Sequence, residues 1–304
     1  FRRVLFRSGS IRQPASYCGL VGYKPTYGAV SRYGLIAMGS SLDQAGPMTN
    51  TVADAELVHN VMAGLDKHDA TTIAPDTYPT LPEKTTYTFG VPRDFMKSGV
   101  DADVLETFEK HLDLLRSQGH IIVDIDLPLF EKGLAAYYIV MPAEVSSNLA
   151  RFDGIRYGHS AEGKNLLEVY QKSRAQGFGA EVKRRILLGT HVLSSGYYDA
   201  YYKKAQQVRS LILQDFKNAF QKVDAILTPV APSAAFSINN AKTQDAVTMY
   251  LNDIFTIPAS LAGMPAISVP AGFDKDGLPL GLQIIGNHFD EQTILDIALS
   301  LEKK

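Results

Sequence analysis

Hydrophobic positions recur along the chain with two periods, one typical of helices and one of short buried strands. Apolar residues three and four positions apart predict a helix over residues 51–65, with Thr51 and Asp54 forming a capping box. The same spacing predicts further helices over 101–119, where Asp101 is the expected cap, and over 129–152, 165–176, 180–193, 198–222 and 289–303. Short apolar runs predict strands at 87–91, 120–128, 224–229, 266–273 and 281–286. Since the first two strands flank a helix, we expect a parallel crossover within an α/β fold whose helices cover a mixed sheet.

Glycine and proline interrupt this pattern in two places. Residues 9–47 are rich in both, which predicts tight turns and short strands with little other regular structure. Residues 69–86 are rich in proline and threonine and predict an exposed loop. The tyrosines at 137, 138, 197, 198, 201 and 202 form aromatic runs for which core packing is the expected role.

Composition narrows the possible functions. The 30 Lys and Arg residues nearly balance 32 Asp and Glu residues, so binding nucleic acid mainly by charge is not expected. No run of about 18 apolar residues and no hydrophobic signal core occur, which predicts a soluble, intracellular protein without a membrane partner. Cys18 is the single cysteine, so no internal disulfide can form, and no Cys/His cluster indicates a metal site.

Several motifs of well-known enzyme classes are absent from the sequence. There is no HExxH, no CxxC pair, no GxxxxGKS/T loop and no GxGxxG, which argues against a metal hydrolase or a nucleotide-binding domain. The seven histidines are scattered, and no GxSxG accompanies them, so a Ser-His-Asp hydrolase has no support.

The segment GSIRQPAS, residues 9–16, is the best candidate for chemistry. Gly9 permits a tight turn and leaves Ser10 beside exposed backbone N–H groups, an arrangement that suits an acyl-transfer nucleophile. The other interpretation is a Gly-Ser turn followed by a strand that ends at proline, and the eight residues alone favour it. Asp43, in SSLDQAGPM, is expected to order the loop near the site rather than to take part in chemistry.

Residues 9–16 and the run that follows them to Gly64 together resemble the amidase signature family, whose nucleophilic serine lies in a GGSxRxPA segment. The resemblance implies an α/β/α sandwich with a mixed central sheet covered by helices. It also implies that Ser10 attacks an amide to form an acyl ester, while the backbone at Gly9 helps to form the oxyanion hole.

Later segments resemble one branch of this family, the glutaminase subunits of tRNA-dependent amidotransferases. They include PAEVSSNLARFDGIRYG, AEVKRRILLGTHVLSSGYYDAYYKKAQQVR and YLNDIFTIPASLAGMPAISVPAGF. The resemblance implies hydrolysis of glutamine, with ammonia passing to the amidating partner GatB for conversion of Glu-tRNA(Gln) or Asp-tRNA(Asn). GatB and GatC are the implied partners, and tRNA is contacted through GatB. ATP and Mg are used at GatB, so no cofactor is expected on this cytoplasmic chain.

Two charged residues are candidates for binding the glutamine backbone. A free amino acid presents a carboxylate that suits an arginine fork and an ammonium that suits an aspartate. By resemblance, Arg185 in KRRILLGT binds the α-carboxylate and Asp253 in YLNDIFT binds the α-ammonium. Arg184 is the alternative for the first role, because adjacent helical positions point about 100° apart. A partly buried ion pair is the structural alternative for Arg185 and Asp253.

The first residues depart from the family pattern. Where the family has SDTGGS, residues 5–10 read LFRSGS, so residues 1–8 are expected to be foreign or artefactual. Residues 9–304 then correspond to the C-terminal two-thirds of a single amidase-signature domain with its N-terminal part missing. The family's activating lysine and second serine lie upstream of this match, which predicts near-background glutaminase activity for the chain as given. A stand-alone amidase and an inactive scaffold for GatB and GatC remain as alternatives.

Overall fold

The computed structural model describes residues 9–79, 84–237 and 246–302. The chain separates into two compact units. The sheet unit contains residues up to 35, residues 44–134 and residues from 209 onward, and the helical unit contains residues 36–43 and 135–208.

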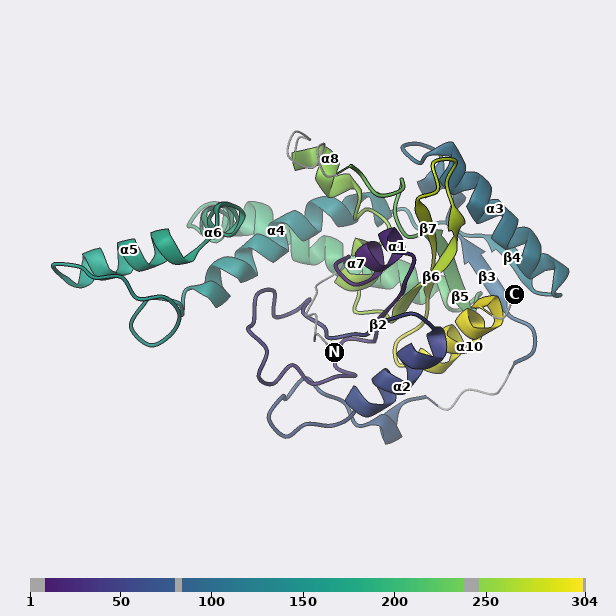
Figure 1. The fold of residues 1–304 in the computed structure, drawn as a ribbon, viewed down its shortest axis with the longest axis horizontal. Helices are drawn as coiled ribbons and strands as arrows, with labels where there is room; N and C mark the ends of the chain where they lie inside the picture. The colour runs from purple at the N-terminus through teal and green to yellow at the C-terminus, as the bar shows by residue number, and fades with distance from the viewer. Residues whose placement is uncertain (1–8, 80–83, 238–245, 303–304) are drawn as a thin grey trace. The chain divides into compact units, whose positions relative to one another are not determined.

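A mixed sheet of seven strands forms the centre of the sheet unit, in the order β2-β1-β6-β7-β5-β3-β4 (Figure 1). The strands are β1 Val21–Lys24, β2 Met48–Thr49, β3 Thr88–Val91, β4 Ile121–Asp124, β5 Ala225–Pro229, β6 Ala266–Phe273 and β7 Pro279–Ile285. Strand β3 pairs in parallel with β4 and β5, whereas the remaining pairs are antiparallel. The predicted α/β fold with a mixed sheet is thereby confirmed.

The helices of the sheet unit that contact its strands are α1 Arg12–Tyr17, α2 Val52–Met62, α3 Ala102–Ser117 and α10 Glu291–Glu302. The unit also contains α8 Ala246–Leu251, α9 Ile257–Leu261 and short 3-10 turns at Pro75–Thr77 and Arg93–Met96. The buried side of α3 carries Val104, Phe108, Leu112 and Leu115, spaced by three and four residues. Helices α2 and α10 pack against each other beside the sheet (Figure 1).

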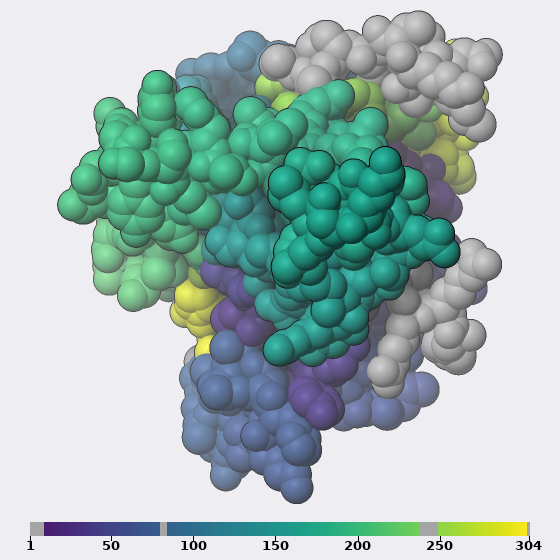
Figure 2. All heavy atoms as spheres, turned by 90° about the vertical axis from the view of Figure 1, so that its left-hand side faces the viewer, coloured from purple at the N-terminus to yellow at the C-terminus, as the bar shows by residue number. Residues whose placement is uncertain are grey.

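The helical unit consists of helices joined by loops. Helix α4, Phe130–Leu149, begins in the sheet unit, and α7, Lys204–Ala219, returns to it. Between them lie α5 Leu166–Gly177, α6 Ala180–Val192 and the π-helical turn η3 Tyr198–Lys203. These helices appear in teal and green in Figure 2. Within the described part of the chain, no helix combines the length and apolar character that a membrane crossing needs.

Most predicted elements are found, and two local expectations are wrong. The strand-helix-strand crossover exists as β3, α3 and β4, and α2 starts with the backbone N–H of Asp54 donating to the Thr51 hydroxyl at 3.1 Å. Asp101 is the N-cap residue of α3 as predicted, although its side chain makes no capping hydrogen bond. The segment after Ser10 forms helix α1 rather than a strand. Tyr137 is buried as expected, whereas Tyr197, Tyr198 and Tyr201 are exposed.

His59 on α2 makes the stability of the sheet unit depend on pH. Its ring is buried edge-on to Tyr23 with centroids 5.1 Å apart, and burial lowers the pKa of His59 to about 4. The usual pKa of histidine is about 6.5, so below this pH His59 is protonated in the unfolded state but stays neutral in the folded state. The free energy of unfolding therefore falls as the pH drops from about 6.5 toward 4. The loss reaches roughly 3 kcal/mol.

Replacing His59 by phenylalanine removes this titration and keeps an aromatic ring beside Tyr23. Urea unfolding at pH 7.5 and pH 5 should show a smaller loss of stability on acidification for His59→Phe than for the parent chain. Equal losses of unfolding free energy in the two proteins would show that the pKa of His59 is not lowered in the folded state.

Candidate active site

Gly9 and Ser10 immediately precede α1, and the local sequence explains this short helix. Pro14 lies in the first turn, where a missing backbone N–H is tolerated, and Gly19 with φ 65° ends the helix. The backbone N–H of Gln13 donates to the Gly9 carbonyl at 2.9 Å, so the residue before Ser10 is held to the helix start. Ser10 itself is half-buried.

Gly9, the residue before Ser10, packs directly against Asp253, although 243 positions separate Ser10 from Asp253 in the sequence. A Cβ atom added at Gly9 would overlap the Asp253 carboxylate and would lie 2.6 Å from the Thr256 hydroxyl. Only glycine leaves room for this approach. The structure therefore brings together three of the predicted positions, namely Gly9, Ser10 and Asp253.

Asp253 lies in a hydrogen-bonded turn that leads into α9. The backbone N–H groups of Thr256 and Ile257 each donate to its carbonyl at 3.0 Å, and the Thr256 hydroxyl lies 3.4 Å from its carboxylate. Tyr17 on α1 belongs to the same surroundings, since burial and then the negative charge of Asp253 raise the pKa of the Tyr17 phenol. The phenol therefore stays protonated beside the carboxylate at neutral pH.

Arg12 links the segment of Gly9 and Ser10 to this turn and to the sheet by hydrogen bonds. Its guanidinium is fully buried and donates to Gln283 Oε1 at 2.5 Å, to the Thr256 carbonyl at 2.8 Å and to Ser260 Oγ at 2.8 Å. Gln283 on β7 in turn donates to Thr228 Oγ1 at 2.8 Å and to the Phe255 carbonyl at 2.9 Å. A buried polar network of this kind fixes one arrangement of the elements that it joins.

Arg185 belongs to the helical unit, on α6, and is half-buried. Its Nε donates to Glu181 at 2.8 Å and its Nη1 lies 3.5 Å from the sulfur of Met141. Burial acts to lower the pKa of Arg185, but Glu181 and the nearby Tyr137 and Tyr138 outweigh it and raise that pKa. The guanidinium is thus a permanent, partly desolvated cation.

Arg184 occupies a more exposed side of the same helix. Its side chain is 57% exposed against 23% for Arg185, and it also pairs with Glu181, at 2.5 Å. The two candidates for binding the substrate α-carboxylate therefore differ in exposure, and the side chain of Arg185 is the more buried of the two. The contact between Arg185 and Glu181 is also a partly buried ion pair, which was the alternative to a substrate-binding role for Arg185. Which arginine binds substrate remains a prediction.

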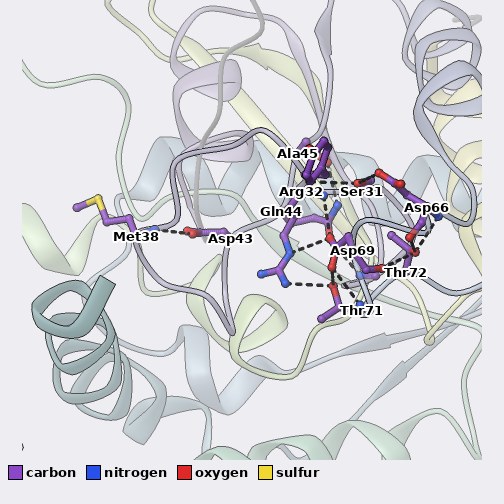
Figure 3. Close-up of polar contacts among 12 residues, drawn as sticks. Ser31, Arg32, Met38, Asp43, Gln44, Ala45, Asp66, Asp69, Thr71 and Thr72 are labelled. Carbon is purple, nitrogen blue, oxygen red and sulfur yellow. Dashed lines mark hydrogen bonds and ion pairs between the residues drawn. The ribbon is translucent and has the colours of Figure 1, made fainter. Parts of the chain in front are cut away.

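The other conspicuous carboxylates order loops (Figure 3). In the helical unit, Asp43 accepts a hydrogen bond from the backbone N–H of Met38 at 2.8 Å, which confirms its expected role. In the sheet unit, Asp69 accepts from the backbone N–H of Arg32 at 2.9 Å, and Asp66 accepts from the Ser31 hydroxyl at 2.6 Å. No group of histidine, cysteine and acidic side chains among the described residues could hold a metal ion.

Sequence reasoning missed two contributors to the site. Arg12 lies inside the motif that indicated Ser10. The available signal was that Arg12 is the one charged residue in the segment 9–16. Tyr17 lies at the end of the same helix and carried no signal beyond its place in α1. Both are recognised only once Asp253 is seen beside α1.

Comparison with known sequences gives one consistent family. The profile of the family described as Amidase matches residues 7–295. The A subunit of glutamyl-tRNA(Gln) amidotransferase from Rhodospirillum rubrum is 53% identical over 300 residues, which cover 97% of this chain and 60% of the relative. The protein of the same name from Pelagibacter ubique is 54% identical over 300 residues, covering 97% and 62% respectively. The chain thus spans about 60% of the length of these curated relatives.

Solved structures agree with the sequence matches. The A subunit of glutamyl-tRNA(Gln) amidotransferase from Thermotoga maritima superposes with a TM-score of 0.79 at 42% identity, covering 99% of this chain and 62% of the other. A crystal structure described as an amidase superposes with a TM-score of 0.77 at 26% identity over the same shares of the two chains. The fold around Ser10, Arg12 and Asp253 is therefore one that these proteins share.

Proposed function

Because this chain belongs to the amidase family, we propose that it carries the glutamine-hydrolysing site of a tRNA-dependent amidotransferase, with Ser10 as the nucleophile. The packing of Gly9, which precedes Ser10, against Asp253 is the observation that supports this proposal most directly. It supports the proposal because Asp253, an acidic side chain that suits the ammonium of an amino-acid substrate, lies against the residue that precedes Ser10.

The proposed reaction has two steps. Ser10 Oγ attacks the side-chain amide carbon of glutamine, and the C–N bond breaks to release ammonia and leave a glutamyl ester. Water then attacks the ester carbonyl, which releases glutamate and returns the serine hydroxyl. Backbone N–H groups of the turn at Gly9 and Ser10 stabilise the negative oxygen formed in each step. Asp253 binds the α-ammonium and Arg185 binds the α-carboxylate.

The names of the relatives support a role within a larger assembly, since each is one subunit of an amidotransferase. We propose that ammonia passes from this site to GatB, where ATP and Mg activate the aminoacyl end of Glu-tRNA(Gln) or Asp-tRNA(Asn). GatB and GatC complete a cytoplasmic heterotrimer, and the tRNA is held through GatB. The near-neutral charge of this chain fits a protein that does not bind tRNA mainly by charge.

Hydrolysis is best tested in a chain that joins residues 9–304 to the N-terminal segment of the Rhodospirillum rubrum relative, assembled with GatB and GatC. Asp253→Asn and Arg185→Gln should each raise the KM for glutamine by about 10- to 100-fold, since each removes one charge-assisted hydrogen bond worth about 1.5–3 kcal/mol. The changes in kcat should be smaller. Arg184→Gln measures the alternative assignment, and Arg116→Gln is a matched control, because Arg116 pairs with Asp113 on the exposed side of α3.

Two results would contradict the proposal. Unchanged KM values for glutamine in both Asp253→Asn and Arg185→Gln, with turnover of other small amides, would indicate a stand-alone amidase. An assembled parent protein that binds its partners without hydrolysing glutamine would indicate a scaffold.

A further inference from the structure

We infer that Thr256 is a positioning residue for substrate recognition, whose buried hydroxyl holds the Asp253 carboxylate in one orientation beside Gly9. This inference rests on the proposed function, because it takes Asp253 as the binding site of the glutamine α-ammonium. In this role Thr256 acts through Asp253 and does not itself touch the substrate.

The backbone of Thr256 is fixed on both sides of its Cα atom. Its N–H donates to the Asp253 carbonyl at 3.0 Å, in the turn that leads into α9. Its carbonyl accepts from Arg12 Nη2 at 2.8 Å and from Ser260 Oγ at 3.2 Å. The residue is fully buried, and threonine is stiff about χ1 because its Cβ carries two heavy atoms. The hydroxyl therefore has a defined position relative to the turn.

The hydroxyl of Thr256 is directed at Asp253. Its Oγ1 lies 3.1 Å from the Asp253 carbonyl and 3.4 Å from Asp253 Oδ1, so one proton is shared between two oxygens of the same residue. The torsion that turns a carboxylate about its Cβ–Cγ bond has only broad preferences. A hydrogen bond from a rigid donor therefore limits a rotation that the aspartate side chain alone would leave open. A carboxylate has about four lone-pair positions, so it can accept from Thr256 and from an ammonium group at the same time.

Gly9 shows that this hydroxyl and this carboxylate lie on the same side of the residue before Ser10. A Cβ atom placed on Gly9 would lie 2.6 Å from Thr256 Oγ1 and would overlap Asp253 Oδ1. Both oxygens thus occupy the space beside Gly9 where a side chain would otherwise be. The hydroxyl therefore orients the carboxylate at the place where the carboxylate meets the segment of Gly9 and Ser10.

A purely structural role for Thr256 makes a different prediction. Loss of a buried hydrogen bond would then disturb the turn and the segment of Gly9 and Ser10 together, and every ligand of the site would bind less well. The positioning role affects only ligands that carry an α-ammonium. It also disappears when Asp253 no longer carries a carboxylate. Ligand preference and coupling to Asp253 therefore separate the two roles.

The test compares L-glutamine with glutaramate, which has the same amide and carboxylate but lacks the α-amino group. In the assembled protein of the hydrolysis test, the KM for glutamine and the inhibition constant of glutaramate together give the preference for the α-ammonium. Thr256→Val keeps the shape of the side chain and removes the hydroxyl. It should lower this preference about 3- to 10-fold, the range for loss of one side-chain hydrogen bond. The inhibition constant of glutaramate should stay within about twofold of the parent value.

A double-mutant cycle shows whether Thr256 acts through Asp253. Asp253→Asn should raise the KM for glutamine by itself, and Thr256→Val added to Asp253→Asn should raise that KM no further. Thr77→Val is the matched control, because the Thr77 hydroxyl also donates to a carbonyl three residues earlier, that of Ala74, on an exposed turn. This variant should behave as the parent does.

A second pair of variants keeps the test decisive if thermal unfolding shows that Thr256→Val does not fold. Thr256→Ser and Thr256→Ala differ from each other only in the hydroxyl. The serine variant should keep the preference for glutamine over glutaramate, and the alanine variant should lose it to the extent expected for valine. Equal preferences in the two variants would overturn the inference.

Three results with Thr256→Val would also overturn the inference. They are an unchanged preference, an equal loss of affinity for glutamine and glutaramate, and a further rise in KM when the change is added to Asp253→Asn. The last two would assign Thr256 a structural role only. A parent protein without any preference for glutamine over glutaramate, or an unchanged preference in Asp253→Asn, would instead contradict the proposed function. The two failures are thus distinguishable.

Discussion

Ser10→Ala should lower the rate of glutamine hydrolysis by about 10⁴-fold or more while leaving glutamine binding within a few-fold of the parent value. Ser10 Oγ is the atom proposed to bond to the amide carbon, so without it no glutamyl ester can form. The removed group is one hydroxyl on a half-buried residue, so the fold of the sheet unit should persist. Steady-state kinetics in the assembled protein and calorimetry with glutamine give the two measurements.

A second assay examines the intermediate itself. Hydroxylamine intercepts an acyl ester, so the parent protein should form the γ-hydroxamate of glutamate from glutamine, and Ser10→Ala should form none. Ser117→Ala is a suitable control, because Ser117 is an exposed serine at the end of α3 whose hydroxyl donates to the carbonyl of Leu114 in its own helix. Continued hydroxamate formation by Ser10→Ala would place the nucleophile elsewhere.

The sequence predicts the regular elements well where a single periodicity governs them. In α3 the apolar residues alternate at three and four positions and face the sheet, so local pattern and tertiary packing require the same helix. Strands β5 and β7 were likewise visible as short buried runs between turns. In these segments the residues that define the element are also those that bury it.

Helix α1 shows why other segments were misjudged. Its six residues include a proline and a fully buried arginine, a composition that favours a turn or a strand end. The helix is stabilised by contacts that the local sequence does not contain, since Arg12 donates to Gln283, 271 positions away. The prediction that the tyrosines of η3 pack in the core was also wrong. Residue type alone does not determine burial, because aromatic residues are found on surfaces as well as in cores.

The site was predictable only in part, for the same physical reason. The motif predicts Ser10 as the nucleophile, and the chemistry of the proposed amino-acid substrate predicts an arginine and an aspartate, for which Arg185 and Asp253 are the candidates. The position of each in space depends on which elements the fold brings together, and no local pattern encodes the approach of Asp253 to Gly9. A buried arginine is nevertheless informative, because burying a cation is costly unless it is bound on several sides.

Gly9→Ala should lower kcat/KM for glutamine by about 100-fold or more, although it adds only one methyl group. The added carbon would overlap the Asp253 carboxylate and approach the Thr256 hydroxyl to 2.6 Å, so residue 9, together with the adjoining Ser10, must move away from Asp253. A displacement of about 1 Å between reacting groups can reduce a rate by about 10²-fold. Kinetics in the assembled protein, with thermal unfolding to measure any loss of stability, provide the test.

The matched control is Gly179→Ala, at the start of α6. A Cβ atom there meets nothing within 4 Å, and the residue has φ −67°, so alanine fits without strain. Combining Gly9→Ala with Thr256→Ala separates the two overlaps, because it relieves the contact with the hydroxyl and leaves the one with Asp253. The double variant should therefore stay impaired. Full activity in Gly9→Ala would mean that Asp253 does not pack against the nucleophile segment, and the proposed ammonium site would then lose its main support.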